Sequence, residues 1–148
     1  PGLRVVVTEG STIWVPELLH LMDHRYESHH FSAKLGTGYR QHLKMKPSDY
    51  FRRNIRVGSS AMSRREAELR HEIGLETIMW GTDYPHPEGT WPATDTKVDT
   101  AFEGLPEGDI ENILGVNAAE WYDFDVEKLA PIADRIGPTA DRFAGDPV

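Results

Sequence analysis

The fold is decided by the stretch Glu76-Thr-Ile-Met-Trp-Gly-Thr-Asp-Tyr-Pro-His86. Its apolar run, Ile78–Trp80, is too short for a buried helix and lacks polar alternation, so it predicts an interior strand buried on both faces. Asp83 follows within a turn-forming cluster. An ionised carboxylate at the end of a buried strand carries a large desolvation penalty unless a cation, a metal or several donors lie beside it. We therefore expect chemistry at Asp83, with a simple turn-capping or helix-capping Asp as the alternative.

Two further strand–helix units precede this stretch. Leu3–Thr8 is rich in β-branched residues and predicts a buried strand, and residues 54–57 predict a second, brief strand. A capping box over Ser63–Glu66 predicts a helix start, and Gly74 predicts the end of that helix. Asn117 is expected to cap another helix, more weakly than Ser or Thr would. The remaining helices are expected over residues 14–25, 47–51, 95–102, 107–114, 118–122 and 126–136.

This order of elements predicts an α/β fold with parallel strands and crossover helices. Three such strands form a poor domain alone, because a parallel sheet needs both faces covered and here has two open edges. A (β/α)₈ barrel of about 250 residues is the natural parent, and this chain has 148 residues. We expect residues 1–125 to be about three C-terminal βα units of a TIM-like barrel, and residues 126–148 to be a tail packed on its exterior.

Composition limits the classes of partner. The net charge of −8 argues against nucleic acid, because phosphate binding needs a basic face. No window approaches the roughly 20 apolar residues of a membrane span, and no signal sequence is visible at the N-terminus, so no membrane partner is expected. The sequence contains no cysteine, so any metal must be held by His, Asp, Glu or water. The lack of disulfides is compatible with a cytoplasmic location.

Four segments together resemble the amidohydrolase-2 (amidohydrolase-related) family. The more specific pair is Gly-Thr-Asp-Tyr-Pro-His at 81–86 and Asn-Ile-Leu-Gly-x-Asn-Ala-Ala at 112–119; the other two are Leu3–Gly10 and Trp14–Asp23. The family contains metal-dependent barrel hydrolases and decarboxylases. The resemblance implies that the chain corresponds to the last three βα units of such a barrel.

The resemblance also implies roles for particular residues. Asp83 matches the aspartate at the end of the last barrel strand, a metal ligand that often takes part in proton transfer. The expected cofactor is therefore a divalent metal, with zinc as the first choice, and the expected partner is a small-molecule substrate. None of the seven histidines lies in the His-x-His pattern of the family, so the remaining ligands are expected upstream of Pro1. Decarboxylases of the family often carry a His where this sequence has Glu9, which favours hydrolysis of a C–O or C–N bond over non-oxidative decarboxylation.

Other side chains have both a functional and a structural interpretation. Glu9 is either catalytic or a surface carboxylate near a helix N-terminus. His86 either binds substrate or is a solvated loop residue, and Trp80 either lines a substrate pocket or packs in the core. The pair His29-His30 is a poor metal site, because adjacent side chains point in different directions on regular structure.

A second hypothesis belongs to a different class of protein. The chain would be a catalytically inactive partial barrel, a structural or binding subunit that completes its sheet by homo-oligomerisation or by association with the N-terminal part. The missing metal histidines and the open sheet edges motivate it. On either hypothesis we expect the isolated chain to be inactive.

Overall fold

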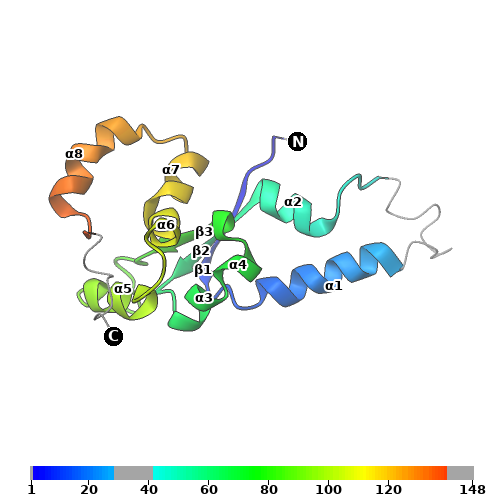
Figure 1. Cartoon of the computed structure of the whole chain (residues 1–148), viewed down its shortest axis with the longest axis horizontal. Helices are drawn as coiled ribbons and strands as arrows, with labels where there is room; N and C mark the ends of the chain where they lie inside the picture. Colours follow the sequence, from blue (N-terminus) through cyan, green and yellow to red (C-terminus); the bar gives the residue numbers. More distant parts are fainter. Residues whose placement is uncertain (1, 29–41, 140–148) are drawn as a thin grey trace.

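The computed structural model describes residues 2–28 and 42–139, and it shows a small sheet with helices packed around it (Figure 1). The strands are β1 (Val5–Gly10), β2 (Ile55–Ser60) and β3 (Ile78–Gly81). The helices are α1 (Val15–Ser28), α2 (Pro47–Asn54), α3 (Arg64–Glu68), α4 (Arg70–Ile73), α5 (Thr94–Phe102), α6 (Glu107–Glu111), α7 (Asn117–Trp121) and α8 (Val126–Ile136). A 3₁₀ turn, η3 (Leu75–Thr77), leads into β3, and a π-helical segment, η4 (Asn112–Val116), joins α6 to α7. The pair His29-His30 lies outside the described residues.

The three strands form one parallel sheet in the order β1-β2-β3. Val7 lies opposite Val57 on β2, and Val57 lies opposite Ile78 on β3. Each strand is followed by at least one helix before the next strand begins. The mixed α/β class and the parallel strands agree with the prediction, and the arrangement is compatible with part of a TIM barrel.

The hydrophobic core lies on one face of this sheet. Ile55 and Val57 of β2 and Ile78 and Trp80 of β3 point into it by strand alternation. The helices contribute Val15, Leu19, Phe51, Ala67, Ile73, Val98, Ala101, Phe102, Ile110 and Ile113. Arg56, which lies between Ile55 and Val57 on β2, points to the opposite face and is only half-buried. On β3, Met79 and Gly81 lie on that face, and only Met79 is buried. Parallel sheets normally have both faces covered. This second face is only partly covered by the described part of the chain, with Met79 buried and Trp121 against Arg56.

The expected burial of the first strand is wrong. No residue of β1 is buried: Val5 and Val6 are half-buried, and Val7 is 42% exposed. The physical reason is that β1 has only β2 beside it and no described helix packs closely against it, whereas η4 and α7 pack against β3. β3 also has β2 as its single neighbour there, but Ile78 and Met79 are buried as predicted.

Local sequence signals account for the helix ends. The Ser63 hydroxyl accepts from the N–H of Glu66, whose carboxylate accepts from the N–H of Ser63, so the predicted capping box is confirmed. Gly74 follows α4 with a φ of 108°, in the left-handed region that favours glycine. The first turn of α2 is held by Asp23 on α1, which accepts hydrogen bonds from the N–H and the hydroxyl of Ser48 at 2.9 and 2.6 Å.

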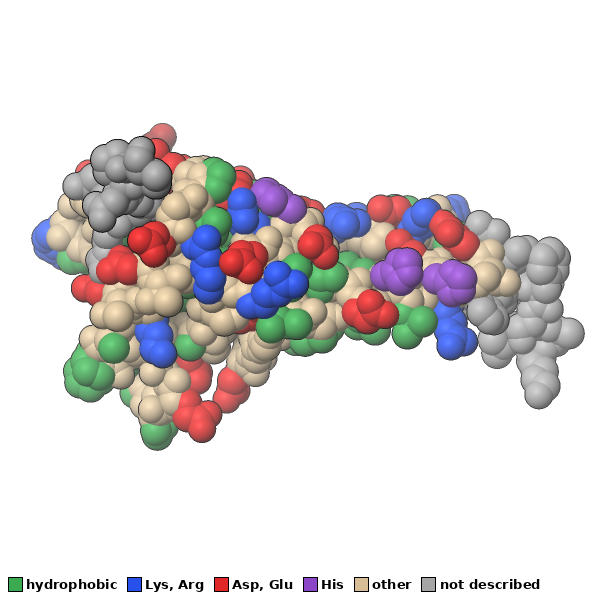
Figure 2. Space-filling view, turned by 60° about the horizontal axis from the view of Figure 1, so that its bottom comes forward, with side chains coloured by type: hydrophobic (Ala, Val, Ile, Leu, Met, Phe, Trp, Pro, Cys, Tyr) green, Lys and Arg blue, Asp and Glu red, His purple; other side chains and the backbone are tan. Residues whose placement is uncertain are grey.

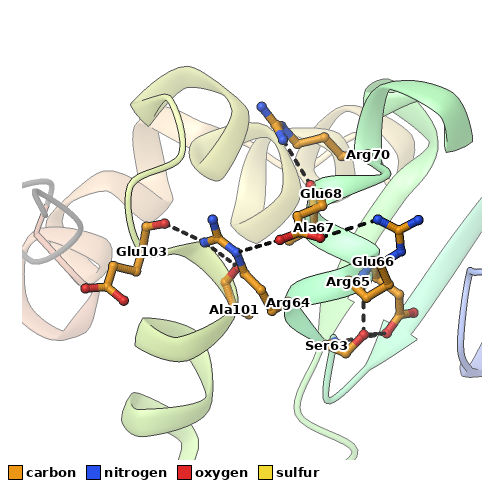
Figure 3. Close-up of polar contacts among 9 residues, drawn as sticks. All are labelled: Ser63, Arg64, Arg65, Glu66, Ala67, Glu68, Arg70, Ala101 and Glu103. Carbon is orange, nitrogen blue, oxygen red and sulfur yellow. Dashed lines mark hydrogen bonds and ion pairs between the residues drawn. The ribbon is translucent and has the colours of Figure 1, made fainter.

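Two arginines join the α3–α4 segment to the helices that follow β3. Arg64 donates to the backbone oxygens of Ala101 and Glu103 at the end of α5 and pairs with Glu68 at 3.5 Å (Figure 3). Arg70 pairs with Asp109 of α6 at 2.6 Å, and these two side chains are only 11% and 16% exposed. These contacts fix the helical layer against which the sheet packs.

Asn117 does not cap a helix, contrary to the prediction. The backbone continues helically from α6 through η4 into α7, which begins at Asn117 without a break, so there is no open helix N-terminus to cap at this residue. The buried Asn117 amide instead donates to the carbonyls of Leu75 and Ile78, at 2.7 and 2.8 Å. The side chain therefore ties the helical segment to the beginning of β3.

The described surface is mixed in charge. Acidic and basic side chains are interspersed over the face in Figure 2. The tail helix α8 has no buried residue, and the predicted packing of residues 126–148 on a barrel exterior stays a prediction. Within residues 2–28 and 42–139, no helix is both long and apolar enough to cross a membrane.

Candidate functional site

Two carboxylates lie at the carboxyl ends of the outer strands. Glu9 is close to the end of β1, and Asp83 lies just after β3. Because both strands run parallel to β2, with Gly10 opposite Ser59 and Ser60 opposite Gly81, the two carboxylates lie at the same edge of the sheet, as the sequence predicts. Their strands are two inter-strand spacings apart, about 10 Å. Carboxyl ends of parallel strands are where barrel enzymes build their active sites.

The backbone at this edge is unusual in a way that the sequence did not reveal. Each strand has a non-glycine residue with positive φ at or just beyond its end: Glu9 at 61°, Ala61 at 52° and Asp83 at 57°. The left-handed region costs such residues on the order of 1 kcal/mol or more, and backbones of this kind cluster at functional sites. The one available signal was that Asp tolerates this conformation better than most residues, and it does not extend to Glu or Ala.

The loop that carries Asp83 is closed by its own backbone. The carbonyl of Thr82 accepts from the N–H of Thr90 at 2.9 Å, and the carbonyl of Asp83 accepts from the N–H of His86 at 2.7 Å. At Gly89, an added Cβ would lie 2.8 Å from the Thr82 oxygen and 2.9 Å from the Asp83 oxygen, so only glycine fits. The loop therefore holds Asp83 in a defined place.

The side chains of Asp83 and His86 lie next to each other in this loop. The Asp83 side chain is 26% exposed, and its Oδ2 lies 3.6 Å from Nδ1 of His86. That nitrogen accepts from the N–H of Glu88 at 3.2 Å, so in this tautomer it has no proton to offer the carboxylate. Among the described residues no group donates a hydrogen bond to the Asp83 carboxylate. Because the single lone pair of Nδ1 is used by the Glu88 N–H, His86 would have to release this hydrogen bond before Nδ1 could bind a cation beside Asp83.

Glu9 lines a separate small cavity at the same edge. The cavity has a volume of about 150 Å³ and lies between the end of β1 and β2, with Trp14 and Val57 among its walls. The Glu9 side chain is exposed and forms no ion pair with another described residue. Its environment is open to solvent, so both interpretations of Glu9, catalytic and surface carboxylate, still apply.

The aromatic residues divide between core and surface. Trp80 is half-buried and packs against the hydrophobic core, which favours the packing interpretation over substrate binding. Tyr84 and Trp91 are instead 67% and 69% exposed and meet edge to face, with ring centroids 6.1 Å apart. This pair belongs to the loop region around Asp83, where an apolar substrate group would find contact area.

Glu66 is a structural residue of this edge that sequence reasoning identified only in part. Its buried carboxylate accepts from the N–H and hydroxyl of Thr12, at 2.6 and 3.0 Å, and from the hydroxyl of Ser59 at 3.0 Å. The N–H and hydroxyl of Ser63 add bonds of 2.9 and 2.8 Å. Only the Ser63 bonds follow from the capping-box pattern. Glu66 thus links the loop after β1, the end of β2 and the start of α3.

The side chains at this edge are of types that bind divalent cations, but there are too few of them for a complete metal site. Asp83 and His86 supply one carboxylate and one imidazole, whereas a catalytic zinc uses about three protein ligands. No group of three or more His, Asp or Glu side chains gathers anywhere in the described ranges. The described residues therefore form at most part of a metal site.

Comparison with known proteins adds one finding. The model of a protein family described as amidohydrolase matches residues 1–124. A search of curated proteins finds no match. The matched region includes the whole sheet and the loops that bear Glu9 and Asp83.

Proposed function

Because the chain belongs to the amidohydrolase family, we propose that it is the C-terminal part of a metal-dependent barrel enzyme acting on a small-molecule substrate. The family is generally metal-dependent. We favour hydrolysis of a C–O or C–N bond, with non-oxidative decarboxylation of a carboxylated substrate as the second reaction. In such sites a divalent ion, zinc as first choice, polarises water or a substrate oxygen.

The observation that carries this proposal is the state of the Asp83 carboxylate. It lies just beyond the carboxyl end of β3, has no hydrogen-bond donor among the described residues, and lies 3.6 Å from Nδ1 of His86. A partly exposed carboxylate with free acceptor oxygens is a ligand that a divalent cation readily takes. In this proposal Asp83 is a metal ligand and accepts a proton, His86 contacts the substrate, and Glu9 accepts a proton or orients the substrate from the same edge.

The open surfaces support an incomplete barrel. One face of the sheet is only partly covered, and β1 presents a free edge among the described residues. The apolar side chains on the outer side of α1 and just before it are 39–48% exposed: Ile13, Trp14, Leu18, Leu21 and Met22. In a barrel the preceding βα unit would pair with the β1 edge and pack on this side of α1.

The test is metal content in a polypeptide that includes the region encoded upstream of Pro1. We expect a divalent ion in stoichiometric amount, measured by elemental analysis of the purified protein, and its loss in Asp83→Asn. Glu88→Gln is the matched control, because it removes the same charge from an exposed side chain of the same loop. Metal content that is equal in Asp83→Asn and in the unsubstituted protein would refute the role of Asp83.

The exposed apolar residues of α1 also favour a second candidate function. The chain would be an inactive partial barrel that covers these residues with a second copy of itself. Native mass spectrometry of the 148-residue chain would then show a metal-free homodimer that Leu18→Asp dissociates. Leu129→Asp on α8 is the control, since it places the same charge on an exposed leucine of another helix.

A further inference from the structure

One cavity lies at the opposite end of the sheet from Asp83. It has a volume of about 430 Å³ and is bounded by the N-terminal segment, the end of α2 and the end of α7. Figure 1 shows the N-terminal segment running between these two helices. The polar and aromatic residues that line the cavity are Arg4, Arg53, Arg56, Asn54, Glu120 and Trp121. Because β1 and β2 begin here, the cleft is remote from the carboxyl-end edge.

Two guanidinium groups stack on one indole ring in this cleft. The guanidinium carbon of Arg56 lies 4.2 Å from the ring centroid of Trp121, and that of Arg4 lies 5.4 Å from it. A stacked guanidinium uses its face and leaves its N–H edge for hydrogen bonds. Three arginines and one glutamate, Glu120, line this cleft, and Asp123 pairs with Arg4 beside it, which leaves an excess of positive charge in a chain with a net charge of −8.

These positive charges are poorly compensated. Arg4 pairs with Asp123 at 2.8 Å, but both side chains are more than half exposed, so the pair is weak. Arg56 donates through Nη1 to the carbonyls of Arg52 and Ile55, and its Nε is buried without a hydrogen-bond partner. In the described part of the chain, neither Arg53 nor Arg56 forms an ion pair with a carboxylate.

Burial is the main cost at Arg56. It lowers the pKa of the guanidinium, an effect that Glu76 and Glu120 oppose and that Arg4 reinforces. Because Nε has almost no exposed surface, an acceptor in the cleft would reach the Arg56 guanidinium through Nη2, which forms no hydrogen bond with a described residue. A half-buried cation with such a free donor is stabilised by an acceptor that carries negative charge. An oxyanion fits this requirement, because its oxygens accept from two guanidinium edges at once.

We propose that this cleft is an anion-binding site for a small oxyanion, either a phosphate or a carboxylate group. Arg56 and Arg4 would hold it against Trp121, with Arg53 adding charge from α2. The site is separate from the edge that carries Asp83, and the proposal does not depend on the proposed function.

Calorimetric titration of the 148-residue chain with inorganic phosphate and, separately, with acetate tests this proposal. At about 0.01 M ionic strength, where the Debye length is about 30 Å, we expect saturable binding of at least one of the two anions. Arg56→Gln should weaken the binding of this anion about tenfold, because one charge-assisted hydrogen bond is lost. The anion that binds more tightly shows whether the site prefers a phosphate or a carboxylate group.

Arg52→Gln is the matched control. Arg52 neighbours Arg53 on α2 and loses the same charge on substitution, but it pairs with Glu76 at 3.8 Å and does not line the cleft. We expect the affinity of the Arg52→Gln chain for the anion to stay within about twofold of that of the unsubstituted chain. Should Arg56→Gln fail to fold, Arg4→Gln and Arg53→Gln alter exposed side chains and serve instead.

Two results would overturn the proposal. Absence of saturable binding of both anions would leave the guanidinium groups as partners for a carboxylate elsewhere in the polypeptide. An equal loss of affinity in Arg52→Gln and Arg56→Gln would mean that the anion is attracted by overall charge and not by this cleft.

Discussion

The carboxylate of Glu66 accepts a 2.6 Å hydrogen bond from the backbone N–H of Thr12, 54 positions earlier in the chain. Together with its bonds to Ser59 and Ser63, this contact joins the segments that follow β1 and β2. The edge of the sheet that carries Glu9 is therefore positioned by a buried residue that lies on neither strand.

Glu66→Gln should lower the free energy of unfolding by about 2–4 kcal/mol. The substituted amide keeps the size of the side chain but turns one acceptor oxygen into a donor, which then faces either the donors of Thr12 and Ser59 at Oε1 or those of Ser63 at Oε2. Urea denaturation followed by circular dichroism measures the change. Glu68→Gln, on the exposed side of the same helix, should stay within about 0.5 kcal/mol, and an equal effect of both substitutions would argue against this network.

The contribution of Glu66 should depend on pH. Burial raises the pKa of Glu66, but the hydrogen bonds from Ser63 and Thr12 outweigh burial and hold this pKa below its ordinary value of 4.5. Because the folded-state pKa is depressed, the stabilisation is complete above about pH 4.5 and is lost as the pH falls through the folded-state pKa. The difference in unfolding free energy between the unsubstituted chain and Glu66→Gln should therefore shrink below pH 4.5. A difference that stays constant down to low pH would contradict this cause.

Asp109→Asn should destabilise the helical layer by about 2–4 kcal/mol, since it leaves the largely buried guanidinium of Arg70 without its counter-charge. Thermal or urea unfolding measures it. The comparison is Glu76→Gln, which breaks the exposed pair with Arg52 and should cost at most about 1 kcal/mol. Similar losses in the two variants would show that burial does not distinguish these pairs.

Asn117→Ala should cost about 2 kcal/mol, because the carbonyls of Leu75 and Ile78 lose their donor. Asn117→Asp should cost more than Asn117→Ala at neutral pH, since a carboxylate then faces two carbonyl oxygens at the same distance. Hydrogen exchange of the β3 amides reports the local effect. If Asp were tolerated as well as Ala, the amide would not be acting as a donor here.

The parts of the fold that sequence reasoning predicted are those set by neighbours in the chain. The Ser63–Glu66 capping box, the glycine stop at Gly74 and the short run Ile78–Trp80 each depend on a few adjacent residues. The strand–helix order then implied a parallel sheet, and the parallel sheet brought Glu9 and Asp83 to one edge.

The parts that it missed depend on contacts between distant residues. The bonds of Glu66 to Thr12 and Ser59 join three segments, and Asn117 was assigned to a cap because its distant carbonyl partners cannot be seen in a local pattern. The exposure of β1 depends on which strand stands beside it, which no property of Leu3–Thr8 specifies. The left-handed backbone of Glu9 has no local sequence signature at all.

The left-handed backbone at Glu9 and Asp83 lowers the stability of the fold at the two positions where the carboxylates are needed for catalysis in the proposed function. Glycine at either position would relax the chain and remove the acid in a single step. Selection for heat resistance alone would therefore tend to erase both carboxylates, whereas a lineage that keeps them retains a less durable protein in exchange for its reactivity.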